Sequence, residues 1–303
     1  MAPLAKDILQ ALPHTPPSVP QLLFRVSHSA SHVTRIGRSF QADCPTPAPS
    51  LSIPSFRDHL SDHLKWTITR PSPFISTTTS LLKALIYARW QCLQGRQNTR
   101  ITLLDGRHLP AGTVYSARAL LHAFEVPPNG TPWHDVPDGE YLVLGQVPER
   151  AWRGEVSYEA IHAEIEMLLP ELADKPHQLL EGLREFYHGA RELIVRAERE
   201  GRGGWLVRAG EYEAARKIGS GFRGHELADN SLLVTLMVLA FRGRGCGSID
   251  WPRVGRDFAG KPLSECLQYP TADAETLASM PEMEEWKRLV EMAKENLGST
   301  SKL

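Results

Sequence analysis

Hydrophobic residues in the first half of the chain gather in short runs that are typical of buried β-strands. Three of these runs, Leu23–Val26, Phe74–Ser80 and Asp138–Leu144, each carry one polar group of distinct chemistry: an arginine, a hydroxyl cluster or a carboxylate. A fourth run, Arg100–Asp105, has the same apolar character. Short apolar runs bounded by glycine and proline favour strands over helices. The pattern therefore predicts that strands are concentrated in the first half of the chain.

Helical spacing is found between these runs. Phe56, Leu60 and Leu64 recur at every fourth residue, which places them on one face of a helix. The apolar positions from Leu81 to Trp90 have similar spacing, so the hydroxyls of Ser76–Ser80 lie where a strand ends and a helix begins. Helix N-capping accounts for one or two of these five hydroxyls. The others are free to serve a binding site.

The composition changes after Ser157, where five segments favour helix: Tyr158–Leu169, Gln178–Glu200, Glu211–Lys217, Leu227–Phe241 and Pro281–Leu297. An earlier segment, Val114–Phe124, also looks helical. The first 20 residues contain five prolines, which cannot sustain a helix. We therefore predict a proline-rich arm over residues 1–20, an α+β module over 21–155 and a helical module over 156–303.

The composition is that of an ordinary globular protein, with 42% hydrophobic and 23% charged residues among 303. The longest strongly apolar run, Leu232–Phe241, is roughly half of the length of about 20 residues that crosses a bilayer, so no membrane segment is predicted. The N-terminus has no basic segment followed by a long apolar core, and we expect no secretory signal. These features predict a cytoplasmic protein.

The cysteines argue against two kinds of site. Cys44, Cys92, Cys246 and Cys266 have no CxxC spacing and no histidine pairs at ligand distance, so we expect reduced thiols and no metal. The sequence also lacks GxGxxG, GxxxxGK[ST] and HExxH, the common motifs for dinucleotides, nucleoside triphosphates and zinc. A formal net charge of −1 makes no general case for nucleic-acid binding. Any such binding has to rest on local patches.

The three polar strands carry a family resemblance. An arginine on the first strand in Leu23–Val26, the Phe-Ile-Ser-Thr-Thr strand and the late Glu-Tyr-Leu-Val strand resemble a widespread group of fungal proteins, which looks like a divergent branch of the ADP-ribosyltransferase fold. The resemblance covers about residues 22–155. It implies an α+β fold with a split, mostly antiparallel sheet and helices, followed here by the helical module.

The ADP-ribosyltransferase resemblance implies particular roles. An arginine fork grips a phosphate of NAD, hydroxyls order the pocket, and a glutamate binds a ribose hydroxyl and stabilises the cationic sugar that forms as nicotinamide departs. These roles fall on Arg25, on Ser76 with Thr77 or Thr78, and on Glu140. Asp138 stands two residues before the glutamate, where many arginine-directed members carry another acid. The chain thus has Asp-Gly-Glu in place of Glu-x-Glu or Gln-x-Glu.

The same group is similar to the fungal arginine-containing cyclodipeptide synthases, which act on aminoacyl-tRNAs. The terminal adenosine of a tRNA resembles the adenosine half of NAD, so related pockets can bind both. Arginine as the amino acid calls for surrounding carboxylates, and one carboxylate or a histidine would deprotonate the attacking amine. The chain offers His134, Asp135, Asp138 and Glu140. A DDxxE motif is absent verbatim, and Asp135, Asp138 and Glu140 are the nearest match.

A tRNA partner also requires contacts to phosphates. Arginines between residues 184 and 223 alternate with glutamates, as on a solvated helix face. A less compensated set is the better candidate for phosphate contacts: Arg242, Arg244, Arg253 and Arg256. A different class of function is suggested by Ser248–Cys266, which faintly resembles part of a Myb-like helical domain.

Three functions follow in order. The first is the synthesis of a cyclo-Arg-Xaa diketopiperazine from aminoacyl-tRNAs, including arginyl-tRNA, in fungal secondary metabolism; it requires no metal and no cofactor. The second is NAD-dependent mono-ADP-ribosyl transfer or NAD hydrolysis, with NAD in the same pocket. The third is a nuclear regulatory or binding protein with a degenerate pocket. The second amino acid and the oligomeric state are left open.

Overall fold

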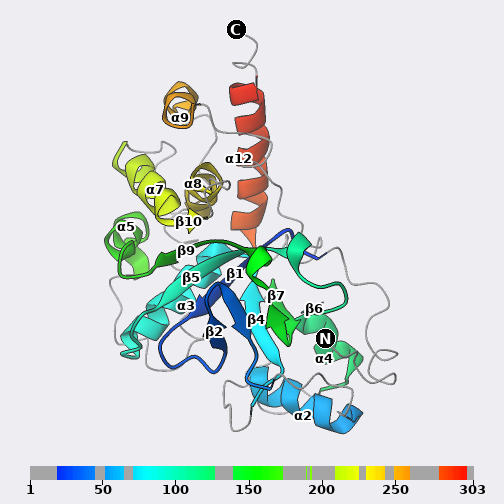
Figure 1. The fold of residues 1–303 in the computed structure, drawn as a ribbon. Helices are drawn as coiled ribbons and strands as arrows, with labels where there is room; N and C mark the ends of the chain where they lie inside the picture. The colour runs from blue at the N-terminus through cyan, green and yellow to red at the C-terminus, as the bar shows by residue number, and fades with distance from the viewer. Residues whose placement is uncertain are drawn as a thin grey trace.

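The computed structural model describes residues 19–44, 52–64, 71–126, 139–172, 189, 192, 209–224, 230–242, 249–259 and 280–298. The fold is α+β, as predicted, with helices packed on antiparallel sheets (Figure 1). Residues 1–18, most of the predicted helix Gln178–Glu200, Cys246 and Cys266 lie outside the described residues.

The larger sheet has seven strands in the order β10-β9-β5-β1-β4-β7-β6, and all of its pairings are antiparallel. Its strands are β1 (Leu22–Ser27), β4 (Phe74–Thr78), β5 (Arg100–Asp105), β6 (Val114–Ser116), β7 (Glu140–Leu144), β9 (Trp152–Ser157) and β10 (Arg223–Gly224). A smaller antiparallel sheet contains β2 (Thr34–Ile36), β3 (Ser39–Gln41) and β8 (Gln146–Val147).

The larger sheet is split between β1 and β4. β1 pairs with β5 along its whole length, from Leu22 to Ser27. Its pairing with β4 consists of one pair of residues, Phe24 opposite Thr78. β4 in turn pairs fully with β7. The sheet therefore consists of two well-paired halves that meet at one point and diverge beyond it.

Helices surround the sheet, with α7, α8, α9 and α12 gathered above it and α2 below it in Figure 1. The α-helices are α2 (Ile53–Leu64), α3 (Leu81–Leu93), α4 (Ala117–Ala123), α5 (His162–Leu168), α7 (Ala209–Gly221), α8 (Ser231–Leu239), α9 (Trp251–Asp257) and α12 (Pro281–Gly298). Short 3₁₀ turns are η2 (Gly106–His108), η4 (Glu149–Ala151), η5 (Pro170–Leu172) and η7 (Ala240–Arg242).

The two halves of the chain share one hydrophobic core. The largest cluster joins Phe24 and Ile101 of the sheet to Leu236 of α8 and Trp286 of α12, all buried. β9 also runs across the predicted domain boundary at residue 155. The division into modules over 21–155 and 156–303 stays a prediction. Apolar burial is the main favourable term in folding, so the C-terminal helices contribute to the stability of the sheet.

Several predicted elements are confirmed, and one is partly wrong. Phe56, Leu60 and Leu64 form the buried face of α2, as their spacing indicates. The predicted helix Val114–Phe124 begins instead with the edge strand β6, because Val114 pairs with Val143 of β7 and Ser116 caps α4 through the Ala119 N–H. β-Branched and aromatic residues fit a pleated, half-buried surface, which accounts for the difference.

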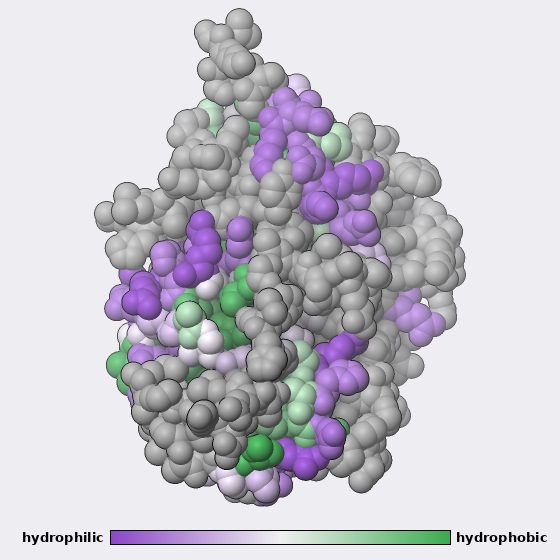
Figure 2. Space-filling model, turned by 90° about the vertical axis from the view of Figure 1, so that its right-hand side faces the viewer, coloured by the Kyte–Doolittle hydropathy of each residue, from purple (hydrophilic) through white to green (hydrophobic). Residues whose placement is uncertain are grey.

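The surface shows no continuous apolar face among the described residues drawn in Figure 2, where hydrophobic residues form small separate patches between hydrophilic ones. The large hydrophobic side chains that are exposed in the described part of the chain are Ile36, Leu93 and Met167. Within that same part, no helix combines the length and the hydrophobicity that crossing a bilayer requires.

Candidate functional site

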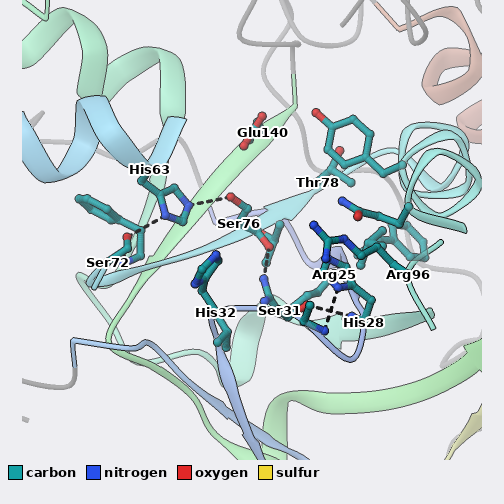
Figure 3. Close-up of a pocket in the computed structure, with 18 of the residues that line it drawn as sticks. Arg25, His28, Ser31, His32, His63, Ser72, Ser76, Thr78, Arg96 and Glu140 are labelled. Carbon is teal, nitrogen blue, oxygen red and sulfur yellow. Dashed lines mark hydrogen bonds between the residues drawn. The ribbon is translucent and has the colours of Figure 1, made fainter. Parts of the chain in front are cut away.

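A cavity of about 230 Å³ lies where β1 and β4 diverge. Its walls come from β1, β4, the end of α2, the first turns of α3 and the start of β7 (Figure 3). The side chains that matter most for its chemistry are Arg25, His63, Ser76, Thr78, Lys83 and Glu140. The predicted Arg25, Ser76, Thr77, Thr78 and Glu140 thus line one cavity, although they are far apart in the sequence. Their predicted roles stay predictions.

Arg25 occupies the split in the sheet. Its Nη1 donates a hydrogen bond of 2.9 Å to the carbonyl oxygen of Ser76, and its guanidinium lies 5.4 Å from the ring centroid of Phe40. Arg25 is only 5% exposed, and its Nε has no hydrogen-bond partner. In the described part of the chain, no carboxylate forms an ion pair with it. Burial lowers the pKa of Arg25 to about 10, so it remains a cation at neutral pH.

The hydroxyls of β4 divide into structural groups and one group that faces the cavity. The Thr77 hydroxyl donates to the Tyr141 carbonyl at 2.9 Å, and Ser80 caps α3 by accepting from the Lys83 N–H at 3.1 Å. Thr78 accepts from the Ser80 N–H at 3.2 Å. These three residues are buried, whereas Ser76 is half-buried at the cavity wall. Ser76 is therefore the hydroxyl of β4 best placed to contact a ligand.

His63 holds the Ser76 hydroxyl. Its Nε2 lies 2.8 Å from Ser76 Oγ, and its Nδ1 lies 2.7 Å from Ser72 Oγ, so the ring bridges the two serines (Figure 3). Burial, together with the charges of Arg25 and His32, lowers the pKa of His63 to about 3. The ring is therefore neutral at physiological pH. A neutral imidazole has one donor and one acceptor, which fixes the orientation of the Ser76 hydroxyl.

Glu140 begins β7 on the opposite wall of the cavity (Figure 3). It is buried, and its Oε2 lies 3.4 Å from the Nζ of Lys83. The preceding Gly139 has φ +72°, and a Cβ there would approach Thr79 Oγ1 to 2.4 Å. Glycine is favoured at such a φ, and here a side chain would also collide. The Asp-Gly-Glu sequence therefore has a structural reason for its glycine.

Further basic groups border the cavity near Arg25. Arg96 and His28 both line it, and Arg96 is exposed. The Ala30 N–H donates to Nδ1 of His28 at 3.2 Å, so the neutral ring carries its proton on Nε2. Burial and the charges of Arg96, Arg25 and His32 lower the pKa of His28. Two arginines and a histidine donor make this end of the cavity suited to an anion.

The other predicted residues are not brought to this cavity within the described part of the chain. His134, Asp135, Asp138 and Arg244 lie outside the described residues, and Arg242 ends η7. Arg253 and Arg256 are on α9, which is remote from the cavity in Figure 1. Arg253 forms ion pairs with Glu213 and Asp257, which compensate its charge. This pairing weakens the case for a phosphate contact at Arg253, whereas Arg256 is exposed.

Sequence reasoning missed two cavity residues, His63 and Lys83. His63 lies in the last turn of α2, and Lys83 follows the capping Ser80 by three residues. Lys83 is fully buried, which is rare for an unpaired lysine, but burial is not visible in a sequence. In the described part of the chain, no group of three or more His, Cys, Asp or Glu residues is arranged to hold a metal ion.

Comparison with known proteins gives one match. A family described as a domain of unknown function, DUF7587, matches residues 18–161. This segment contains β1 to β9 and therefore all of the described walls of the cavity. No curated protein and no solved structure matches the chain. The match therefore delimits the segment that builds the cavity and assigns it no substrate.

Proposed function

We propose that the cavity binds a nucleotide and that the protein is an NAD-dependent ADP-ribosyltransferase or NAD glycohydrolase. The observation that carries the proposal is the guanidinium of Arg25, which is buried in the wall of a cavity without a carboxylate partner among the described residues. A buried charge is costly unless it is paired, so its retention points to an anionic ligand. A phosphate with its oxygen acceptors is suited to that position.

The opposite wall supplies the second requirement of the reaction. The contact between Glu140 and Lys83 uses one carboxylate oxygen, Oε2. The other oxygen can accept a hydrogen bond from a ribose hydroxyl and place negative charge near the sugar. In the reaction, the bond between ribose and nicotinamide breaks, and nicotinamide leaves with the electron pair. Water or an acceptor side chain then adds to the same ribose carbon and loses a proton.

The cyclodipeptide synthase hypothesis uses the same cavity in a different way. The terminal adenosine of an aminoacyl-tRNA would occupy the nucleotide position, with the arginyl group near the acidic residues. His134, Asp135 and Asp138, which that hypothesis requires, lie outside the described residues. It therefore stays a prediction, with arginyl-tRNA as its partner. Both proposals place the protein in the cytoplasm, where NAD and aminoacyl-tRNAs are available.

One pair of assays tests both proposals. Purified protein is incubated with NAD, and separately with charged tRNAs, and the products are identified by mass spectrometry. Nicotinamide and ADP-ribose support the first proposal, and a cyclo-Arg-Xaa product that is lost on RNase treatment supports the second. Glu140→Gln should abolish the product, whereas Glu149→Gln, at an exposed position outside the cavity, should not. No product in either assay refutes both and favours the regulatory hypothesis.

A further inference from the structure

Lys83 forms a buried ion pair inside the cavity wall. Its Nζ lies 3.4 Å from Glu140 Oε2, and the two side chains are 0% and 5% exposed. Both residues line the cavity. A buried ion pair adds little to stability compared with apolar residues of similar size, but removing one partner leaves an uncompensated charge. The pair is therefore better explained by a role in the cavity than by stability alone.

The surrounding structure holds Lys83 in place. Ser80 caps α3 by accepting from the Lys83 backbone N–H, and the Ser80 hydroxyl donates to Glu282 Oε1 at 2.9 Å. Glu282 belongs to the first turn of α12 and is itself buried. The Lys83 ammonium also lies 5.5 Å from the ring centroid of Tyr87. The first turn of α3 is thus fixed from below by β4 and from outside by a helix that follows the matched segment 18–161.

We propose that Lys83 is a positioning residue of the site and acts through Glu140. Its ammonium holds Oε2, so that Oε1 is directed to the ligand and the carboxylate cannot rotate away. This inference rests on the proposed function, because the ligand that Glu140 contacts is taken to be a ribose-containing nucleotide. Lys83 contributes orientation and charge, and it forms no covalent bond with the ligand.

The test compares Lys83→Met with a matched control. Lys217→Met breaks a second Lys–Glu pair with the same Nζ–O distance of 3.4 Å, but Lys217 is 64% exposed and lies outside the cavity. Binding of ADP-ribose is measured by titration calorimetry on folded protein. We expect the Kd to rise at least tenfold in Lys83→Met and to stay within twofold in Lys217→Met. Wild-type affinity in Lys83→Met would overturn the inference while leaving the proposed function intact.

A double-variant cycle separates positioning from general damage. If Lys83 acts through Glu140, adding Glu140→Gln to Lys83→Met should change the Kd much less than Glu140→Gln does in the wild-type background. Equal effects in both backgrounds would show that the residues act independently and would refute the inference. Should Lys83→Met fail to fold, Lys83→Arg keeps the charge, and a Kd near that of the wild type supports the same role.

Failure of the proposed function is visible separately. Wild-type protein that binds no ADP-ribose refutes that function. The Lys83–Glu140 link is then measured in urea denaturation, where the ratio of unfolded to folded protein should rise at least tenfold in Lys83→Met and fall back in the double variant, because the unpaired buried carboxylate is gone. The absence of that recovery would overturn the pairing as well.

Discussion

Replacing Arg25 with methionine should separate folding from binding. Burial lowers the pKa of Arg25 from 12.5 to about 10, and this corresponds to about 3 kcal/mol of cost for the charged form. The substitution removes that cost. It also removes the hydrogen bond to the Ser76 carbonyl, worth about 1.5–3 kcal/mol for a charged donor, and the contact with Phe40, worth about 0.5–1 kcal/mol. The terms nearly cancel, so the free energy of unfolding should change by no more than about 1 kcal/mol.

Binding should respond very differently. A phosphate held by the guanidinium loses at least one charged hydrogen bond, and a loss of about 3 kcal/mol raises the Kd roughly a hundredfold. Urea denaturation and calorimetry with ADP-ribose measure the two quantities on the same protein. A loss of stability above about 3 kcal/mol with unchanged affinity would refute the reasoning, because Arg25 would then be a structural residue that joins the halves of the sheet. Arg25→Lys, which keeps the charge without the fork, should lie between the two.

Three further predictions concern the same cavity. Because the pKa of His63 is lowered to about 3, the unfolded chain binds a proton that the folded protein does not, so stability should fall between pH 6.5 and pH 3, by about 2 kcal/mol at pH 5; His63→Gln should lack this component in urea titrations. Ser76→Ala should weaken ADP-ribose binding about tenfold, whereas Thr77→Val should leave the Kd unchanged and cost about 1 kcal/mol of stability by losing the Tyr141 bond; the opposite pattern would place the ligand elsewhere. An anion bound beside His28 should raise the lowered pKa of that ring, so calorimetry in buffers of different ionisation enthalpy should detect proton uptake near neutral pH, and His28→Gln should abolish it.

Local patterns in the sequence were sufficient for the elements that surround the cavity. The apolar spacing of α2 and the strand-to-helix change at Ser80 both depend on neighbouring residues, and both match the structure. β9 was not predicted, because Arg153 and Gly154 interrupt its apolar pattern; Arg153 is buried through a hydrogen bond to Asn230, a partner 77 residues away. Strands that are stabilised by distant partners carry a weak local signal.

The candidate site shows the same limit. Arg25, Ser76 and Glu140 could be selected because each stands out within its own strand, and the structure places all three at one cavity. The neutral state of His63 and the burial of Lys83 arise from packing between α2, α3 and the sheet, which no spacing in the sequence encodes. The split between β1 and β4 is likewise a property of pairing, visible only once the register is known.

The single pairing of Phe24 with Thr78 has a mechanical consequence. A molecule that contacts Arg25 on one half of the sheet and Glu140 on the other spans the joint and restrains it. Occupancy should therefore slow amide hydrogen exchange along β1 and β4 together, although neither strand has to change its conformation. The cavity would then act as the keystone of the sheet, and its ligand would be a component of the fold as well as its substrate.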